Sequence, residues 1–183
     1  MIEASEICKL LRYEPETGKL FWKPRVIELF KDERSWKIWN TRYANQEAFT
    51  AVSERGQKSG AIFGVNYTAH RVAWAVHHGE WPKETIDHIN GNPSDNRLCN
   101  LREATKLDQG KNMPLNSTNT SGVIGVYKHS AANVWIARIN LNGVMRHIGS
   151  FKLFKDAVQA RKIAEILAGY HPNHGRSAAT QGV

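Results

Sequence analysis

Cysteine is scarce in this sequence, in which Cys8 and Cys99 are the two thiols. Two cysteines so far apart along the chain supply neither a disulfide framework nor a four-cysteine zinc site. We therefore expect the protein to be in a reducing, intracellular compartment, which is the cytoplasm. Long apolar runs are missing as well, since no stretch reaches the roughly 18 residues of a membrane-spanning helix, and no charged segment followed by an apolar one stands at the N-terminus. Neither export nor insertion into a membrane is expected.

Acidic residues are too few to balance the basic ones. The 183 residues include 25 Lys and Arg against 17 Asp and Glu, which gives a formal net charge of +8. Most of the excess lies in residues 101–183, which hold eleven basic and four acidic residues. A basic surface on one part of a chain suits a polyanion, because each neutralised phosphate releases counterions. Nucleic acid is therefore the expected partner, and the alternative is a basic protein that its charge merely keeps soluble.

Polar turn-forming residues divide the chain into two parts. Residues 113–121 are rich in Pro, Asn, Ser and Thr, which cannot bury an apolar face, so we predict a linker there. It separates an N-terminal domain at 1–112 from a C-terminal domain with its tail at 122–183. Hydrophobic residues make up 41% of the sequence, as in a folded protein.

The N-terminal domain is predicted to mix short strands with helices. Residues 3–12 have apolar positions at helical spacing, residues 20–22 form a brief strand, and residues 48–67 alternate in the manner of strands joined by hairpins. The segment HRVAWAVHHGEWP, residues 70–82, predicts a helix stopped by its glycine and proline. Residues 26–47 show no clear period, and we predict loop or irregular structure there.

The segment with the most chemical information is TIDHINGNPSDNRLCNLR, residues 85–102. Adjacent Asp87 and His88 supply a metal ligand and a base at one point of the chain. Neighbouring side chains of a strand face opposite sides, so both can serve one site only at a strand end or a bend. The following Asn-Gly-Asn-Pro-Ser-Asp-Asn stretch is rich in turn formers and supplies such a bend.

These motifs resemble the ββα-metal fold of the HNH endonuclease family. The resemblance rests on Asp-His-Ile-Asn-Gly-Asn, then Asp-Asn-Arg-Leu, then Asn-Leu-Arg before a short helix. Upstream, AHRVAW and GEWP resemble segments of phage HNH endonucleases, so the resemblance covers roughly residues 66–112. It implies a homing endonuclease of phage type that hydrolyses phosphodiester bonds in duplex DNA by nicking or double-strand cleavage, in the host cell cytoplasm if phage-encoded.

The resemblance also implies a role for each motif residue. Asp87 is expected to bind Mg²⁺ or Mn²⁺, His88 to act as the general base, and Asn100 to brace the loop by hydrogen bonds. The following helix supplies the second metal ligand. Gln109 stands where relatives have Asn or His, and Asn112 on the same helical face is the competing candidate.

Three further residues of this region have open roles. Arg97 and Arg102 either contact phosphate or are solvated. His70, which opens the predicted helix, either contacts DNA or is a structural residue that makes hydrogen bonds.

The C-terminal domain is predicted to be a three-stranded antiparallel sheet with a helix on one face. Three segments alternate apolar with polar residues or are rich in β-branched and aromatic residues. The turn Asn142-Gly143 joins the last two of these segments. Residues 154–168 form the helix, with one apolar face made of Ala157, Ala160, Ile163, Ala164 and Leu167.

The segments GVYK, WIARI, NG, IGSF and AxxARxxA, within roughly residues 120–170, resemble the AP2 type of DNA-binding domain. The resemblance implies contacts with double-stranded DNA from Lys128, Trp135, Arg138, Asn140 and Arg146. Alternation leaves open which face of the middle strand meets DNA, and Trp135 is either a contact or part of the core.

Together these features predict an α+β protein, with a ββα-metal core preceded by strands and a helix and followed by the AP2-like domain. It acts as a monomer or a homodimer. The alternative is a sequence-specific DNA-binding protein whose HNH core is inactive, because Gln109 departs from the family pattern.

Overall fold

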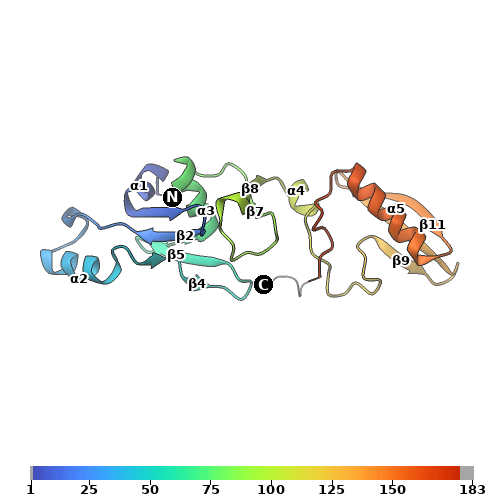
Figure 1. Ribbon diagram of the computed structural model, residues 1–183, viewed down its shortest axis with the longest axis horizontal. Helices are drawn as coiled ribbons and strands as arrows, with labels where there is room; N and C mark the ends of the chain where they lie inside the picture. Colours follow the sequence, from blue (N-terminus) through green and yellow to red (C-terminus); the bar gives the residue numbers. More distant parts are fainter. Residues whose placement is uncertain (1, 178–183) are drawn as a thin grey trace. The chain divides into compact units, whose positions relative to one another are not determined.

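The computed structural model describes residues 2–177 and divides into two compact units, Met1–Glu103 and Ala104–Val183. Both units combine small sheets with helices (Figure 1), which confirms the predicted α+β class. Within residues 2–177, no helix has the length and apolar character needed to cross a membrane. The last part of the predicted tail, residues 178–183, lies outside the described residues.

The first unit contains three small sheets. The first has the antiparallel strands β1 (Leu11–Glu14), β2 (Lys19–Trp22) and β3 (Glu47–Ala48). The second has the antiparallel strands β4 (Ala51–Val52), β5 (Lys58–Ile62) and β6 (Val65–Thr68). In the third, β7 (Thr85–His88) pairs with β8 (Leu101–Ala104).

One hydrophobic core joins these sheets to two helices, α1 (Ala4–Leu10) and α3 (Ala69–His78). Helix α3 ends at Gly79, whose φ of 75° is left-handed, as the sequence predicted. Ile86 of β7 and Leu101 of β8 are both in the core. They hold the two ends of the loop between β7 and β8 in place, because both strands that flank this loop are buried in the core.

The prediction of irregular structure at residues 26–47 was wrong in part. Helix α2 (Glu33–Tyr43) lies there, preceded by the short η1 (Ile27–Leu29), and none of its residues is buried. Asp32 caps it by accepting a hydrogen bond from the Ser35 amide at 2.7 Å. Arg25 also contacts the helix, with its guanidinium 4.0 Å from the ring centre of Trp39. Local capping and cation–π contact therefore replace the buried apolar face that a periodic pattern would reveal.

The second unit contains the predicted three-stranded antiparallel sheet, ordered β11–β10–β9. Its strands are β9 (Val126–His129), β10 (Val134–Leu141) and β11 (Val144–Phe151), and α5 (Phe154–Leu167) follows. Asn142 and Gly143 both have positive φ in the tight turn between β10 and β11. Trp135, Ala137 and Ala157 belong to one core cluster, so α5 covers the face of β10 that carries Trp135 and Ala137.

The apolar face predicted for α5 is only partly correct. Ala157 is buried, but Ile163 is 51% exposed and Leu167 is 82% exposed. The buried positions that follow Ala157 are Arg161 and Glu165, which form an ion pair at 3.3 Å. A charged pair four residues apart therefore occupies the inward face in place of apolar side chains.

The boundary between the units differs from the predicted one. Residues 104–112 belong to the second unit, and the predicted linker pairs with the C-terminal segment of that unit. The amide of Gly175 donates to the carbonyl of Met113 and that of Leu115 to Arg176, both at 2.8 Å. These backbone hydrogen bonds fix residues that composition alone describes as a linker, because main-chain N–H and C=O groups can pair whatever the side chains are.

Candidate active site

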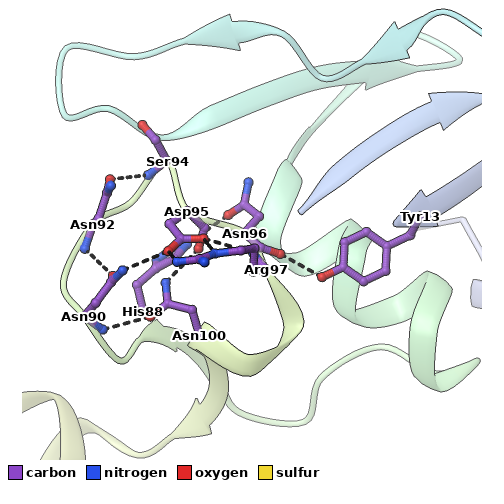
Figure 2. Close-up of polar contacts among 9 residues, drawn as sticks. All are labelled: Tyr13, His88, Asn90, Asn92, Ser94, Asp95, Asn96, Arg97 and Asn100. Carbon is purple, nitrogen blue, oxygen red and sulfur yellow. Dashed lines mark hydrogen bonds and ion pairs between the residues drawn. The ribbon is translucent and has the colours of Figure 1, made fainter. Parts of the chain in front are cut away.

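His88 is at the end of β7, at the start of a polar loop (Figure 2). Its side chain is buried, and its Nε2 lies 2.9 Å from the amide oxygen of Asn96, itself 2% exposed. An amide oxygen only accepts hydrogen bonds, so Nε2 is the donor. The basic nitrogen of the neutral ring is then Nδ1, and Asn96 fixes both the orientation and the tautomer of His88.

Asn96 is in turn held by the first sheet of the same unit. The hydroxyl of Tyr13 on β1 donates to the carbonyl of Asn96 at 2.7 Å (Figure 2). Burial raises the pKa of Tyr13, so its hydroxyl stays protonated and remains a donor. Next along the loop, the amide of Leu98 donates to the carbonyl of Pro15 at 3.0 Å. The first sheet therefore positions the residue that orients His88.

Gly18 makes the closest approach between the first sheet and this loop. A Cβ at Gly18 would lie 2.5 Å from the backbone nitrogen of Arg97 and 2.5 Å from the carbonyl carbon of Asn96, and the φ of Gly18 is +72°. Gly18→Ala is expected to lower the free energy of unfolding by roughly 2–4 kcal/mol, because overpacking adds to left-handed strain. The hydrogen bond between Asn96 and His88 should also be disturbed, because Asn96 must move.

Gly64→Ala is the matched control for Gly18→Ala. Gly64 has a similar φ of +78°, but a Cβ at Gly64 would have nothing within 4 Å. Urea unfolding of both variants separates backbone strain from collision with the loop. Equal unfolding midpoints for the two variants would contradict the role given to the contact at Gly18.

Asn100 lies inside the loop and uses both ends of its amide. Its oxygen accepts from the amide of Asn90 at 2.9 Å, and its Nδ2 donates to the carbonyl of Asp95 at 2.7 Å (Figure 2). Its own carbonyl accepts from the amide of Ile89 at 2.9 Å. The loop therefore closes around a buried side chain that does not itself need to take part in a reaction.

The two arginines of the motif are both paired with carboxylates of the first unit. Arg97 donates from Nε to Asp95 at 2.8 Å and from Nη2 at 2.6 Å (Figure 2), and these bonds lower the pKa of Asp95. Arg102 on β8 donates to Oδ2 of Asp87 at 2.9 and 3.2 Å. The sequence did not reveal the Asp87–Arg102 pair, because it depends on the pairing of β7 with β8.

His70 on α3 is beside His88. The two ring centres are 5.2 Å apart at an interplanar angle of 80°, and His70 is 8% exposed. Its Nε2 lies 3.3 Å from the hydroxyl of Thr68, while its Nδ1 has no hydrogen-bond partner among the described residues. Burial lowers the pKa of His70 to about 4, so it adds no positive charge next to His88 at neutral pH.

The two candidates for the second metal ligand belong to the second unit. Gln109 is on the short helix α4 (Lys106–Gly110), which directly follows β8 in the chain. Asn112 is buried, and its amide oxygen accepts from Nη1 of Arg176 at 3.0 Å. Within residues 2–177, no group of three or more His, Cys, Asp or Glu side chains is arranged to hold a metal ion. A site made of Asp87 and an amide oxygen is not a cluster of that kind.

The five residues expected to contact DNA do not share one face of the sheet. Paired strand residues lie on the same face, and β10 pairs Trp135 with Lys128 and Ile139 with Arg146. These positions share the face that α5 covers, where Trp135 packs against Phe154 with ring centres 4.6 Å apart. Arg138 and Asn140 alternate to the opposite face and are exposed. The structure thus favours a core role for Trp135, the alternative that the sequence left open.

Comparison with known proteins places residues 67–111 in a family. These residues match the family model described as HNH endonuclease. Protein 3.8 of Escherichia phage T7 is 32% identical over 87 residues, which cover 47% of this chain and 72% of that protein. No solved structure matches. The match contains β7, the loop fixed by Asn100, β8 and α4, so the chain belongs to the HNH endonuclease family and is a relative of phage Protein 3.8.

Proposed function

We propose that this protein is a metal-dependent endonuclease that hydrolyses phosphodiester bonds in duplex DNA. The observation that carries the proposal is the geometry of His88, whose tautomer Asn96 sets through a 2.9 Å hydrogen bond and which directly follows Asp87. We also propose that cleavage is site-specific, as in homing endonucleases. A monomer would nick one strand, or a homodimer would cut both.

His88 would act as the general base. Its Nδ1 takes a proton from a water molecule as the water oxygen attacks phosphorus, and the bond from phosphorus to the leaving oxygen breaks. Asn96 keeps the Nε2 hydrogen in place while the ring gains charge, as a hydrogen-bond acceptor next to an imidazolium should. His70 is uncharged at neutral pH, so it does not repel the positive charge that forms on the His88 ring.

Asp87 would hold Mg²⁺ or Mn²⁺, and Gln109 and Asn112 stay the candidates that the sequence gives for a second ligand. Carboxylate and amide oxygens are hard ligands of the kind these ions prefer, so the donor set fits. When bound, the ion would supply charge stabilisation at the phosphate and the leaving oxygen. Arg102 balances the charge of Asp87 through two hydrogen bonds to one carboxylate oxygen.

The second unit would act as the AP2-like reader of duplex DNA. Arg138 and Asn140 are exposed on the face of the sheet that α5 leaves open, which supports contacts from these two residues. Arg138→Ala should weaken DNA binding by about tenfold and lower its salt dependence. Lys155→Ala, at an exposed position of α5, is the control. Equal affinities of the two variants in fluorescence anisotropy would contradict this assignment of the face.

The endonuclease proposal is tested on supercoiled plasmid or phage DNA. Nicked or linear product should form with Mg²⁺ or Mn²⁺ and should disappear when EDTA removes the ion. Product formation that is unchanged by EDTA would contradict metal dependence.

A DNA-binding protein with an inactive HNH core is the second candidate. The feature that favours it is Gln109, which departs from the Asn or His of the HNH pattern. Tight, salt-sensitive DNA binding without any cleavage would select it.

A further inference from the structure

The second unit contains a cavity of about 400 Å³. Its wall combines α4 and the segment that follows it, the turn between β10 and β11, Arg161 of α5, and Tyr170 and His174 of the C-terminal segment. Small-molecule sites in proteins usually have volumes of roughly 300–1,000 Å³. The size therefore suits a ligand of modest size, and none of the proposed nuclease residues Asp87, His88, Gln109 and Asn112 lines this cavity.

Two buried hydrogen-bond donors in this wall lack an acceptor. Arg161 is 2% exposed, and its Nη2 lies 3.3 Å from Nε2 of His174. A guanidinium only donates, so Nε2 of His174 accepts and the imidazole hydrogen is on Nδ1. Among the described residues, neither this Nδ1 nor Nη1 of Arg161 has a hydrogen-bond partner. Unsatisfied buried donors are costly, so an acceptor bound in the cavity beside Arg161 and His174 would stabilise the pair.

The charge of the wall indicates that this acceptor is an anion. Lys106, Lys111 and Arg161 line the cavity, and no Asp or Glu is among its described lining residues. Glu165 pairs with Arg161 at 3.3 Å and also with Lys162 at 2.8 Å, so it offsets only part of this charge. A guanidinium beside an imidazole N–H and two lysines suits the several oxygens of a phosphate.

The rest of the wall offers an apolar surface. Leu107, Met113 and Met145 line the cavity and are 52%, 55% and 58% exposed. Methionine side chains adapt to flat and irregular partners, including aromatic rings. A phosphate alone would leave these side chains uncovered, whereas a nucleobase attached to the phosphate would cover them.

We propose that this cavity binds a nucleoside monophosphate unit, with its phosphate at Arg161 and His174 and its base against Leu107, Met113 and Met145. The same chemical unit has two sources, a free mononucleotide and the phosphorylated 5′ end of a DNA strand. Either source presents one terminal phosphate and one accessible base.

Isothermal titration calorimetry on the full chain tests the site without any cleavage, so its result is independent of the nuclease proposal. The probes are the four deoxynucleoside monophosphates, the matching nucleosides, inorganic phosphate, and a short single strand with and without a 5′ phosphate. A mononucleotide should bind at least tenfold more tightly than its nucleoside and than inorganic phosphate. Comparison of the mononucleotide with the 5′-phosphorylated strand then identifies the source.

Two variants locate the binding. His174→Phe removes the Nδ1 donor and should weaken nucleotide binding at least tenfold, with circular dichroism to verify folding. Met145→Trp fills the cavity from its exposed rim and should have the same effect without touching the buried pair. Leu153→Trp is the matched control, because Leu153 is 52% exposed and does not line the cavity. It should bind within twofold of wild type.

Three results would overturn the proposal. The first is no saturable binding of any phosphate-bearing probe to the wild-type chain. The second is binding of inorganic phosphate as tight as that of the mononucleotides. The third is nucleotide binding that Met145→Trp leaves unchanged.

Discussion

His88→Ala is expected to slow DNA cleavage by roughly 10²- to 10⁴-fold, the usual contribution of a general base. DNA affinity should stay close to that of the wild type, because His88 is 8% exposed and makes its hydrogen bond to Asn96 inside the loop. Single-turnover cleavage of a labelled duplex at saturating protein measures the chemical step apart from binding.

His78→Ala is the matched control for this prediction. His78 is exposed at the end of α3, and its ring contacts those of Trp74 and His77. It should cleave at the wild-type rate. Loss of activity in both variants, or in neither, would contradict the assignment of the base to His88.

Asp87→Asn is expected to lower cleavage at least 10²-fold at metal concentrations that saturate the wild type. The substitution keeps the shape of the side chain and one amide oxygen, but removes the charge that a divalent ion requires from its ligand. Raising the Mn²⁺ concentration should restore part of the activity, because a weaker site fills at higher concentration. The measurement is the cleavage rate as a function of metal concentration.

Asp156→Asn on the exposed first turn of α5 is the control for Asp87→Asn. It should leave both the rate and the metal dependence unchanged. An Asp87→Asn protein with the wild-type rate and the wild-type metal requirement would show that Asp87 is not a ligand, and the Asp87–Arg102 pair would then be structural.

The parts of the fold that were predictable have a local signal. Strands β10 and β11 alternate and are joined by Asn142-Gly143, whose preference for positive φ fixes the turn. Helix α3 ends at a glycine for a similar reason. In contrast, α2 buries none of its residues, so no periodic apolar pattern indicates a helix there. Its capping residue Asp32 is a weak signal when such a pattern is missing.

The buried face of α5 was mispredicted because of an ion pair. Arg and Glu side chains normally favour solvent, but Arg161 and Glu165 neutralise each other's charge in an ion pair. Nε of Arg161 also donates to the carbonyl of Ile124 at 2.9 Å. Such burial depends on the segment that packs over the helix. Propensity and periodicity along the helix itself therefore cannot predict it.

The candidate site was predictable only where the sequence motif is continuous. Asp87, His88 and Asn100 lie in one short segment, and the resemblance of that segment to the HNH family implied the roles predicted for them. The hydroxyl of Tyr13 that binds Asn96 comes from 83 residues away, and the ring of His70 beside His88 comes from helix α3. Contacts between distant segments have no local pattern, so the residues that orient His88 emerged from the structure.

The role of His88 is tested most directly by cleavage and binding measured on the same samples of wild type and His88→Ala. Both proteins are incubated with supercoiled DNA and Mn²⁺, with an EDTA aliquot beside each. We predict equal amounts of bound DNA, metal-dependent nicking by the wild type, and nicking at least 10²-fold slower by His88→Ala. Equal nicking by the two proteins, or bound DNA that the wild type never cuts in the presence of Mn²⁺, would contradict a nuclease in which His88 is the base.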